Sequence, residues 1–230
     1  SRYEVSHLGS WCLCEDKQLS EYVSNDGGSR SNIEKIIFPS NYVKSKLLKG
    51  ESFGGLTPKN VSIPSSVTEI GDGAFSNCSS LTSIEIGSGV TKIGDGAFQD
   101  CSSLTSIEIP SSVTEIGNRA FKDCSSLTSI YILPSVTKIG YGAFSNCSSL
   151  DGITIPSSVT EIGDGAFQDC SNLQSIYMEP TIPPTLLLFN IIGVLSNCPA
   201  IIYVPFDSGD AYKNAPGWRK YASRIFEYSF

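Results

Sequence analysis

The sequence has very few of the side chains on which most enzyme active sites are built. Its 230 residues include one histidine, His7, and one methionine. It shows no Ser/His/Asp set, no glycine-rich loop that would cradle phosphates and no metal-spaced cluster of cysteine and histidine. The sequence therefore predicts neither an enzyme nor a bound cofactor or metal. His7 is interpreted as part of a packed or solvated N-terminal cap.

Positive charge and long apolar runs are also scarce. Lysine and arginine total 16 against 23 aspartate and glutamate residues, so the net charge is −7. An acidic surface repels phosphate backbones, which argues against nucleic acid as a partner. The longest apolar run, Leu186 to Leu195, is interrupted at Asn190 and Gly193. It falls well short of the roughly 20 residues of a membrane span, so we expect no membrane insertion by this chain.

No leader sequence is visible at the start of the chain. The opening residues Ser1-Arg2-Tyr3 are typical of a trimmed or mature chain. The missing leader is therefore no argument for a cytosolic location.

What the sequence has in abundance is one phrase of 23 residues. Five regular copies stand end to end over residues 63–177, beginning at residues 63, 86, 109, 132 and 155. Two columns keep this register: Phe75, Phe98, Phe121, Phe144 and Phe167, and, three residues later, Cys78, Cys101, Cys124, Cys147 and Cys170. A period of this length is typical of a solenoid, in which each repeat packs only on its neighbours.

Each copy contains two extended phrases. The phrase Leu81-x-x-Ile84-x-Ile86 predicts a strand whose isoleucines point inward while the residues between them point outward. Residues 67–71 predict a second, shorter strand, and residues 73–78 leave room for no more than a turn or two of helix. One copy buries too little apolar surface to offset the entropy of ordering its backbone, so the array is predicted to fold cooperatively.

The cysteine column is predicted to consist of buried, reduced thiols that act as small hydrophobic side chains. Stacked rungs give neighbouring cysteines parallel Cβ vectors, which is poor disulfide geometry, although disulfide rungs are the alternative. Cys198 is expected to mark a sixth rung. Cys12 and Cys14 are too close for an ordinary bridge and lack further ligands for a metal, so their role stays open.

Equivalent outward positions form columns along a solenoid. One column alternates in sign and is predicted to select the register of the rungs, with ligand binding as the alternative: Glu69, Lys92, Glu115, Lys138 and Glu161. A second column is acidic at one end and aromatic at the other, and it is our candidate ligand-binding face: Glu85, Glu108, Tyr131, Thr154 and Tyr177. Tyr131 and Tyr177 are the candidate anchors. The alternative is that they pack on each other or on nearby aliphatic side chains.

A third column raises the question of calcium. Asp72, Asp95 and Asp164 each stand beside a glycine, but Asn118 and Tyr141 interrupt the series, so turn capping is the better explanation. Formal glycosylation sequons begin at residues 60, 77 and 146, and we discount them because the cysteine inside two of them is expected to be buried.

The ends of the chain depart from the repeat. Residues 1–32 are predicted to form an N-terminal cap, 33–62 degenerate repeats, 178–205 an irregular last repeat and 206–230 a C-terminal cap. In the last repeat, Ile201 and Val204 are assigned the Leu and Ile positions. The spacing of Trp218, Tyr221, Ile225 and Phe226 predicts a cap helix. Its basic residues, which suit either an acidic partner or a solvated face, are Lys213, Arg219, Lys220 and Arg224.

The repeat resembles the BspA-like, or treponemal-type, class of leucine-rich repeats. The resemblance rests on Cys101-x-x-Leu104-x-x-Ile107-x-Ile109-Pro110 and on Ile116-Gly117-x-x-Ala120-Phe121. It implies a single leucine-rich-repeat domain over residues 1–230. It also implies a β-rich solenoid, a right-handed β/α superhelix with short parallel strands and short helical turns. The closing phrase Ile202-Tyr203-Val204-Pro205 resembles proteins of gut Bacteroides-type bacteria, which implies such a source.

Members of this class are typically secreted or surface-exposed, and several are adhesins. The resemblance therefore implies an extracellular or cell-surface module that binds a protein or glycan on host matrix or on bacteria. The motif residues are structural, so it transfers no binding residue. Because the copies are nearly identical, a structural spacer with no ligand of its own is the alternative.

Overall fold

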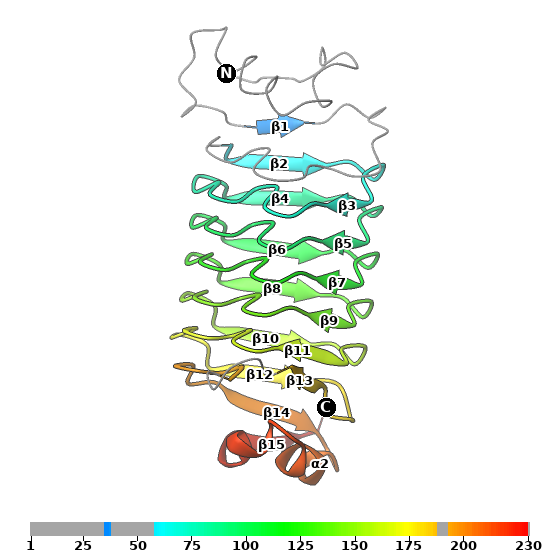
Figure 1. Ribbon diagram of the computed structural model, residues 1–230, viewed down its shortest axis with the longest axis vertical. Coiled ribbons are helices and arrows are strands. Elements are labelled where there is room, and N and C mark those ends of the chain that lie inside the picture. Colours follow the sequence, from blue (N-terminus) through cyan, green and yellow to red (C-terminus); the bar gives the residue numbers. More distant parts are fainter. Residues whose placement is uncertain (1–34, 38–57, 188–192, 230) are drawn as a thin grey trace, which may run out of the picture.

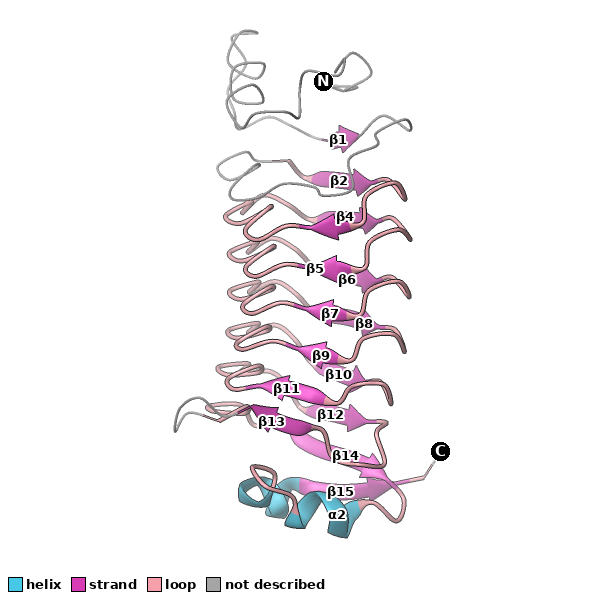
Figure 2. Cartoon of the chain, turned by 45° about the vertical axis from the view of Figure 1, so that its right-hand side comes forward, coloured by secondary structure: helices cyan, strands magenta, loops and turns pink. Residues whose placement is uncertain are grey.

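The computed structural model describes residues 35–37, 58–187 and 193–229. The chain winds into a parallel β-solenoid whose rungs stack along the long axis of the molecule (Figure 1). Each regular rung contributes one four-residue strand to a front layer and one shorter strand to a back layer, with turns between them (Figure 2). The solenoid and the short parallel strands predicted from the repeat are confirmed.

The front layer contains the longer strands: β1 (Lys35–Ile37), β2 (Asn60–Ile63), β4 (Ser83–Ile86), β6 (Ser106–Ile109), β8 (Ser129–Ile132), β10 (Gly152–Ile155), β12 (Ser175–Met178), β14 (Ile201–Pro205) and β15 (Ile225–Tyr228). Their hydrogen-bonded ladders form three sheets, β1-β2-β4, β6-β8 and β10-β12-β14-β15. Residues 23 apart stand level within the regular part, as Glu108 and Tyr131 do.

The back layer is one continuous six-stranded sheet: β3 (Glu69–Ile70), β5 (Lys92–Ile93), β7 (Glu115–Ile116), β9 (Lys138–Ile139), β11 (Glu161–Gly163) and β13 (Thr185–Leu187). Its register sets each lysine of the alternating column beside glutamates. Lys138 Nζ lies 3.9 Å from Glu115 Oε1 and 4.0 Å from Glu161 Oε2. These contacts support the prediction that this column selects the register of the rungs.

The interior consists of like side chains stacked upon like. The five phenylalanines are fully or almost fully buried, and their ring centroids follow one another at 5.3, 5.2, 5.5 and 5.6 Å in stacked pairs. The predicted column of buried thiols is also confirmed, and it continues to Cys198. The thiol of Cys124, for example, donates a hydrogen bond to Phe98 O at 3.2 Å, so the two columns are joined across rungs.

The segment between the two strands of a rung consists of consecutive turns and no continuous helix. Every second amide closes a turn onto the carbonyl three residues earlier, as Ser76 N does onto Gly73 O at 3.0 Å. The amides in between donate to the next rung, as Phe75 N does to Ala97 O at 2.7 Å. In place of the expected helical turn, this segment forms a third set of hydrogen bonds between rungs, in addition to those of the front and back strands.

Two expectations about the C-terminal part are wrong. Ile201 does not occupy the buried Leu position, because β14 pairs with β12 so that Ile201 stands level with Ser175 and points outward. Ile202 is the buried residue, while Val204 does lie in the interior. The shorter connection between Cys198 and β14, compared with regular rungs, shifts this register.

The predicted single helix is replaced by α2 (Gly209–Asn214), a 3₁₀ helix, η2 (Arg219–Arg224), and strand β15. Trp218 and Tyr221 are buried as expected, but Phe226 lies on β15 and is exposed. Trp218 Nε1 donates to Pro184 O at 2.7 Å, and Tyr221 Oη accepts from Leu195 N at 3.1 Å. Both indole and phenol have their polar atoms satisfied by the last rung, which overrides the helical spacing.

The predicted N-terminal cap, with His7, Cys12 and Cys14, lies outside the described residues, as does most of the degenerate region 33–62. The described part of that region, β1 and β2, extends the front layer as expected. The role of residues 206–230 as a cap stays a prediction.

Candidate functional site: two outward surfaces

The front column of candidate residues lies on the outward side of the front layer. Glu85, Glu108 and Thr154 are exposed, Tyr131 is 64% exposed and Tyr177 is 40% exposed. Each is the third residue of its strand, where alternation points it away from the inward-facing residues on either side. The structure therefore brings all five residues onto one face, in the order that the sequence predicts.

At its acidic end, this column continues one rung earlier with a serine, which the sequence analysis did not include. Ser62 stands level with Glu85, and its hydroxyl donates to Glu85 Oε2 at 2.9 Å. A similar contact joins Ser83 Oγ to Asn60 Oδ1 at 2.6 Å. The acidic end is thus partly ordered by hydrogen bonds between adjacent strands.

The aromatic end extends further than predicted. Tyr203 stands level with Tyr177, and Phe226 stands level with Tyr203. The rings of Tyr177 and Tyr203 are stacked with centroids 4.9 Å apart, and Tyr228 meets Tyr177 edge-on at 5.6 Å. We call Tyr177, Tyr203, Phe226 and Tyr228 the aromatic end. Phe226 is 49% exposed. Ile201, which is 37% exposed, lies two residues before Tyr203 on β14 and points to the same side as the aromatic end.

Sequence reasoning missed Tyr203 and Phe226 for different reasons. The phrase Ile202-Tyr203-Val204 matches Ile176-Tyr177-Met178, and that match would have revealed Tyr203 had the register been set from it. Phe226 had no such signal, because β15 lies outside the period. The alternative reading of the anchors is partly realised, since Tyr177 packs on other tyrosines while Tyr131 stays largely in solvent.

One phenol of this end, that of Tyr228, is affected by burial. Tyr228 is half-buried and its hydroxyl donates to Met178 O at 3.3 Å. Its burial, with the nearby charge of Glu179 and the neighbouring Tyr177, raises the pKa of Tyr228 above its usual value of 10.0. The phenol therefore remains a neutral hydrogen-bond donor at physiological pH.

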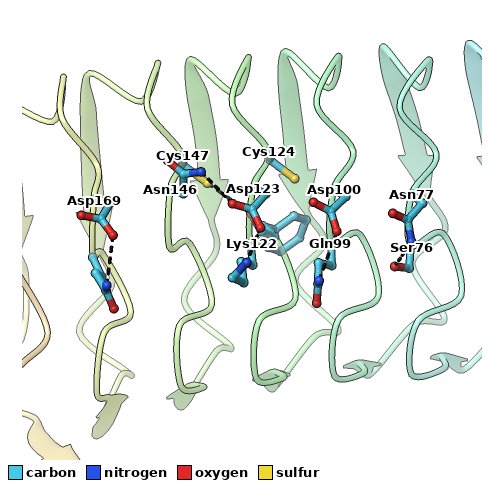
Figure 3. A network of polar contacts seen from close by, with 12 residues as sticks. Ser76, Asn77, Gln99, Asp100, Lys122, Asp123, Cys124, Asn146, Cys147 and Asp169 are labelled. Atoms are coloured by element: carbon cyan, nitrogen blue, oxygen red, sulfur yellow. Dashed lines mark hydrogen bonds and ion pairs between the residues drawn. The ribbon is translucent and has the colours of Figure 1, made fainter. Parts of the chain in front are cut away.

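A second surface is formed by the turns that follow the back strands (Figure 3). Asparagine or aspartate recurs there in the left-handed conformation, with φ between 52° and 63°: Asn77, Asp100, Asp123, Asn146, Asp169 and Asn197. Their side chains also tie rungs together, as Asn146 Nδ2 does by donating to Asp123 Oδ1 at 2.7 Å. These residue types tolerate that backbone conformation best after glycine, which accounts for the column.

The aspartates that raised the question of calcium form a ladder between rungs. Asp72 Oδ1 accepts from Asp95 N at 2.8 Å, Asp95 Oδ1 from Asn118 N at 2.7 Å, and Asn118 Oδ1 from Tyr141 N at 2.8 Å. The carboxylates cap the next rung and not their own turn. The residues that the structure describes contain no group of three or more metal-ligating side chains close enough to hold an ion.

Arg119 is the exception on this turn surface. Its φ is 54°, and among the described residues it is the sole residue with positive φ that is neither glycine, asparagine nor aspartate. The equivalent position is glycine in the other regular rungs, with φ of 58° to 64°. A left-handed conformation costs a residue with a Cβ about 1–2 kcal/mol. The Arg119 guanidinium lies over the ring of Tyr141, 5.4 Å from its centroid.

Comparison with known families decides what kind of repeat this is. The model of the BspA type leucine rich repeat region matches residues 46–174 in six copies, which is more than half of the chain. The chain belongs to the BspA-type leucine-rich repeat family. Comparison with curated proteins gave no match.

Solved structures of bacterial leucine-rich repeat proteins resemble this BspA-type chain. A Treponema pallidum leucine rich repeat protein is 30% identical, with a TM-score of 0.57 over 72% of this chain and 82% of that one. A leucine-rich repeat protein from Bacteroides ovatus is 26% identical, with a TM-score of 0.51 over 76% and 52%. The pneumococcal vaccine antigen PcpA is 26% identical, with a TM-score of 0.55 over 66% and 42%.

These comparisons show a bacterial type of repeat but not a Bacteroides-type source, which stays a prediction. The chain spans about half the length of the Bacteroides ovatus and pneumococcal chains that it resembles. In the described part of this BspA-type protein, no helix is long and apolar enough to cross a membrane. The constant positions of its repeat include all of the buried phenylalanines and cysteines, and also an exposed threonine column, whose hydroxyls donate to the preceding rung, as Thr114 Oγ1 does to Thr91 O at 3.2 Å.

Proposed function

We propose that this BspA-type repeat protein is a secreted or cell-surface adhesion module. Its ligand is a protein or glycan on host matrix or on another bacterium, and it is bound by the outward face of the front layer. The family supports the general class, and one similar structure is that of the pneumococcal vaccine antigen PcpA. The exposed residues of the front layer between Glu85 and Phe226 support this face as the place where the ligand binds.

The observation that carries the proposal is the exposure of aromatic and aliphatic side chains along that face. Tyr131, Tyr177, Ile201 and Phe226 are four of the six large hydrophobic residues that are exposed in the described part. Exposed aromatic residues are the side chains most often found to dominate binding energy. The alternating column of the back layer differs, because its charges contact one another within the protein.

The orientation of the rings favours a protein ligand over a glycan at the aromatic end. Stacking of Tyr177 on Tyr203 turns the ring faces toward each other and leaves edges and hydroxyls at the surface. A sugar ring stacks on an open aromatic face, whereas side chains of a protein also pack against edges and bond to hydroxyls. The carboxylates of Glu85 and Glu108 suit basic groups on that protein.

A triple variant tests the proposal without disturbing the interior. Glu85→Ser, Glu108→Ser and Tyr131→Ser change three exposed positions, and none of the three belongs to the stacked aromatic end. Adhesion to immobilised matrix proteins and to bacterial cells is then measured. We expect at least a tenfold loss of adhesion. The matched control is Glu115→Ser with Lys138→Ser on the back layer, which should adhere like the wild type.

Unchanged adhesion of a folded triple variant rejects Glu85, Glu108 and Tyr131 as part of the binding surface. The near-identity of the rungs supports the second candidate, a structural spacer. If the full chain binds nothing in a screen of matrix proteins, glycans and bacterial cells, the spacer is favoured and the adhesion module is rejected.

A further inference from the structure

The turn surface contains a cluster of departures from the repeat that the proposed front-face function does not use. Asn118 and Tyr141 stand where other rungs have aspartate, Arg119 stands where they have glycine, and Lys122 stands where they have serine or glutamine. These four residues belong to two adjacent rungs. All of them line hollows on the surface formed by the turns after β7 and β9.

Two of the departures break a regular feature of the solenoid, and that of Arg119 is also energetically unfavourable. Tyr141 ends the ladder of side-chain oxygens, so the amide of Asp164 donates to Leu187 O instead of to a side chain of the preceding rung. Arg119 takes up a backbone conformation that strongly favours glycine. The two side chains that depart from the repeat contact each other, because the guanidinium of Arg119 lies over the ring of Tyr141. Strain at an exposed arginine whose guanidinium contacts a half-buried tyrosine ring points to a role for the side chains themselves.

The pair has the geometry of a prepared anion-binding group. A guanidinium that lies over an aromatic ring is held in place while the edge bearing its N–H groups stays open to a planar oxyanion. Arg119 is exposed, and no described carboxylate lies within ion-pair distance of it. The neighbouring cations are already engaged, Lys122 by Asp123 and Lys138 by Glu115 and Glu161.

Two hollows flank this pair and indicate what surrounds the anionic group. One, of about 800 Å³, is lined by Gln99, Asn118 and other polar groups, with Leu187 as its one large aliphatic side chain among the described lining residues. The other, of about 400 Å³, is lined by Lys122, Asn146 and Gln168. Amides and carboxylates suit hydroxyl groups, and the two hollows contain few large apolar side chains for those of a peptide to pack against.

The charge of the lining limits the ligand further. Asp95 belongs to the first hollow, and Asp123 and Asp169 belong to the second. These carboxylates repel a densely charged polyanion, because like charges at close range oppose binding. A ligand with one carboxylate on a frame of hydroxyl groups satisfies both Arg119 and the polar lining.

We propose that Arg119 and Tyr141 form a second binding site, separate from the front layer, that takes the carboxylate of an acidic saccharide such as a uronic acid. Arg119 binds the carboxylate through two parallel hydrogen bonds, and Tyr141 holds the guanidinium in place. Asn118 and Gln99 on one side, and Lys122 on the other, face the hydroxyl groups of the neighbouring sugar units.

The repeat itself supplies the variants that test this site. Arg119→Gly and Tyr141→Asp install residues that other rungs carry at these positions, so both variants should unfold cooperatively with melting temperatures close to that of the wild type. Binding of galacturonate, glucuronate and N-acetylneuraminate, with galactose as the neutral control, is measured on the full chain by ligand-observed NMR and calorimetry. Lys213→Ser, which removes a half-buried cation on α2, is the matched control.

We expect at least one acidic sugar to bind the wild type and Lys213→Ser alike. Affinity should fall at least tenfold in Arg119→Gly, less in Arg119→Lys, and galactose should bind at least tenfold more weakly than the acidic sugar. Equal binding by wild type and Arg119→Gly overturns the site, as does failure of the wild type to bind any of the three acids. An acidic peptide is tested beside the sugars. If Arg119→Gly loses the binding of the peptide but keeps that of the acidic sugars, the saccharide assignment is overturned. The front-face triple variant should keep the binding of the sugar.

Discussion

The back and front layers of one solenoid carry outward columns at the same spacing, yet the two columns differ in kind. The back column alternates glutamate and lysine without exception, and Lys138 contacts the glutamates on both sides. The front column changes from carboxylate to aromatic ring along its length and leaves Tyr131 largely exposed. Strict regularity marks the column that holds the rungs together, whereas irregularity marks the column that is free to contact another molecule.

The largest expected effect acts on the interior that both columns share. Burial raises the pKa of Cys78 and of Cys170 from the ordinary 9.0 to about 12, and the pKa values of the thiols between them also lie well above 9.0. The thiols of the unfolded chain therefore lose protons above pH 9 while the native ones keep theirs. Stability is complete below pH 9 and falls between pH 9 and 12, by about 1.4 kcal/mol per pH unit for each buried thiol.

Urea unfolding at a series of pH values checks this expectation. Cys124→Ala removes one thiol, and its stability should fall less steeply with pH by the share of one group. An alkaline slope that is the same with and without Cys124 would contradict the buried thiol column.

Removing one ring from the phenylalanine stack should have the next largest effect. Phe121→Ala leaves a cavity between the rings of Phe98 and Phe144, which now lie on either side of Phe121. The free energy of unfolding should fall by about 3–5 kcal/mol. Chemical denaturation measures it, with Tyr131→Ala on the front column as a control that should change it by no more than about 0.5 kcal/mol. A small loss for Phe121→Ala would mean that the rungs do not share one interior.

Reversing one charge sharpens the contrast between the columns. Lys138→Glu turns two attractions on the back layer into two repulsions, each worth about 0.2–1 kcal/mol, so stability should fall by about 1 kcal/mol at low salt. The loss should shrink at 1 M salt, since exposed charges are screened. Lys213→Glu on α2 serves as the control. If both variants lose the same stability, the back column has no special role in register.

The smallest effect is expected at Arg119. Arg119→Gly relieves a strained conformation. The glycine also raises the conformational entropy of the unfolded chain, which lowers the stability of the folded protein by about 0.4–1 kcal/mol. It loses the contact with Tyr141 as well, worth about 0.5–1 kcal/mol at an exposed site. Because these contributions oppose one another, the free energy of unfolding should change by less than about 1 kcal/mol. Chemical denaturation measures this change. Gly96→Arg, measured in parallel, creates the same strain on a rung whose neighbour lacks the tyrosine, so comparison of the two variants separates the backbone contributions from the contact with Tyr141. Arg119→Gly destabilising by several kcal/mol would show a structural role instead.

How far the sequence predicts the molecule depends on whether a residue lies inside the repeat. Copies of one phrase repeat the same contacts, so Phe98, Cys101 and the outward position of Tyr131 can all be assigned from spacing. Ile201 could not be assigned by counting from Cys198, because a shortened connection reset the register of β14; only the match of Ile202-Tyr203-Val204 to the preceding strand places it. Phe226 could not be either, since β15 is held by pairing with β14 and has no period of its own.

The candidate sites are less predictable than the fold for the same reason. The front column is a periodic feature and appears in any alignment of the copies. The Arg119–Tyr141 pair consists of two exceptions, and its importance rests on a backbone angle that the chain adopts only when the turns stack. An alignment that counts glycine replacements would single out Arg119, but not the ring beneath it.

The alternating back column also sets a rule for how such a molecule can grow or shrink. Duplicating a single rung would place two glutamates or two lysines side by side, whereas duplicating two adjacent rungs preserves every attraction. With strands about 4.7–4.9 Å apart, the reach of the protein changes by nearly 1 nm per permitted step. Duplication within its gene is therefore expected to preserve the back column when units are gained in even numbers.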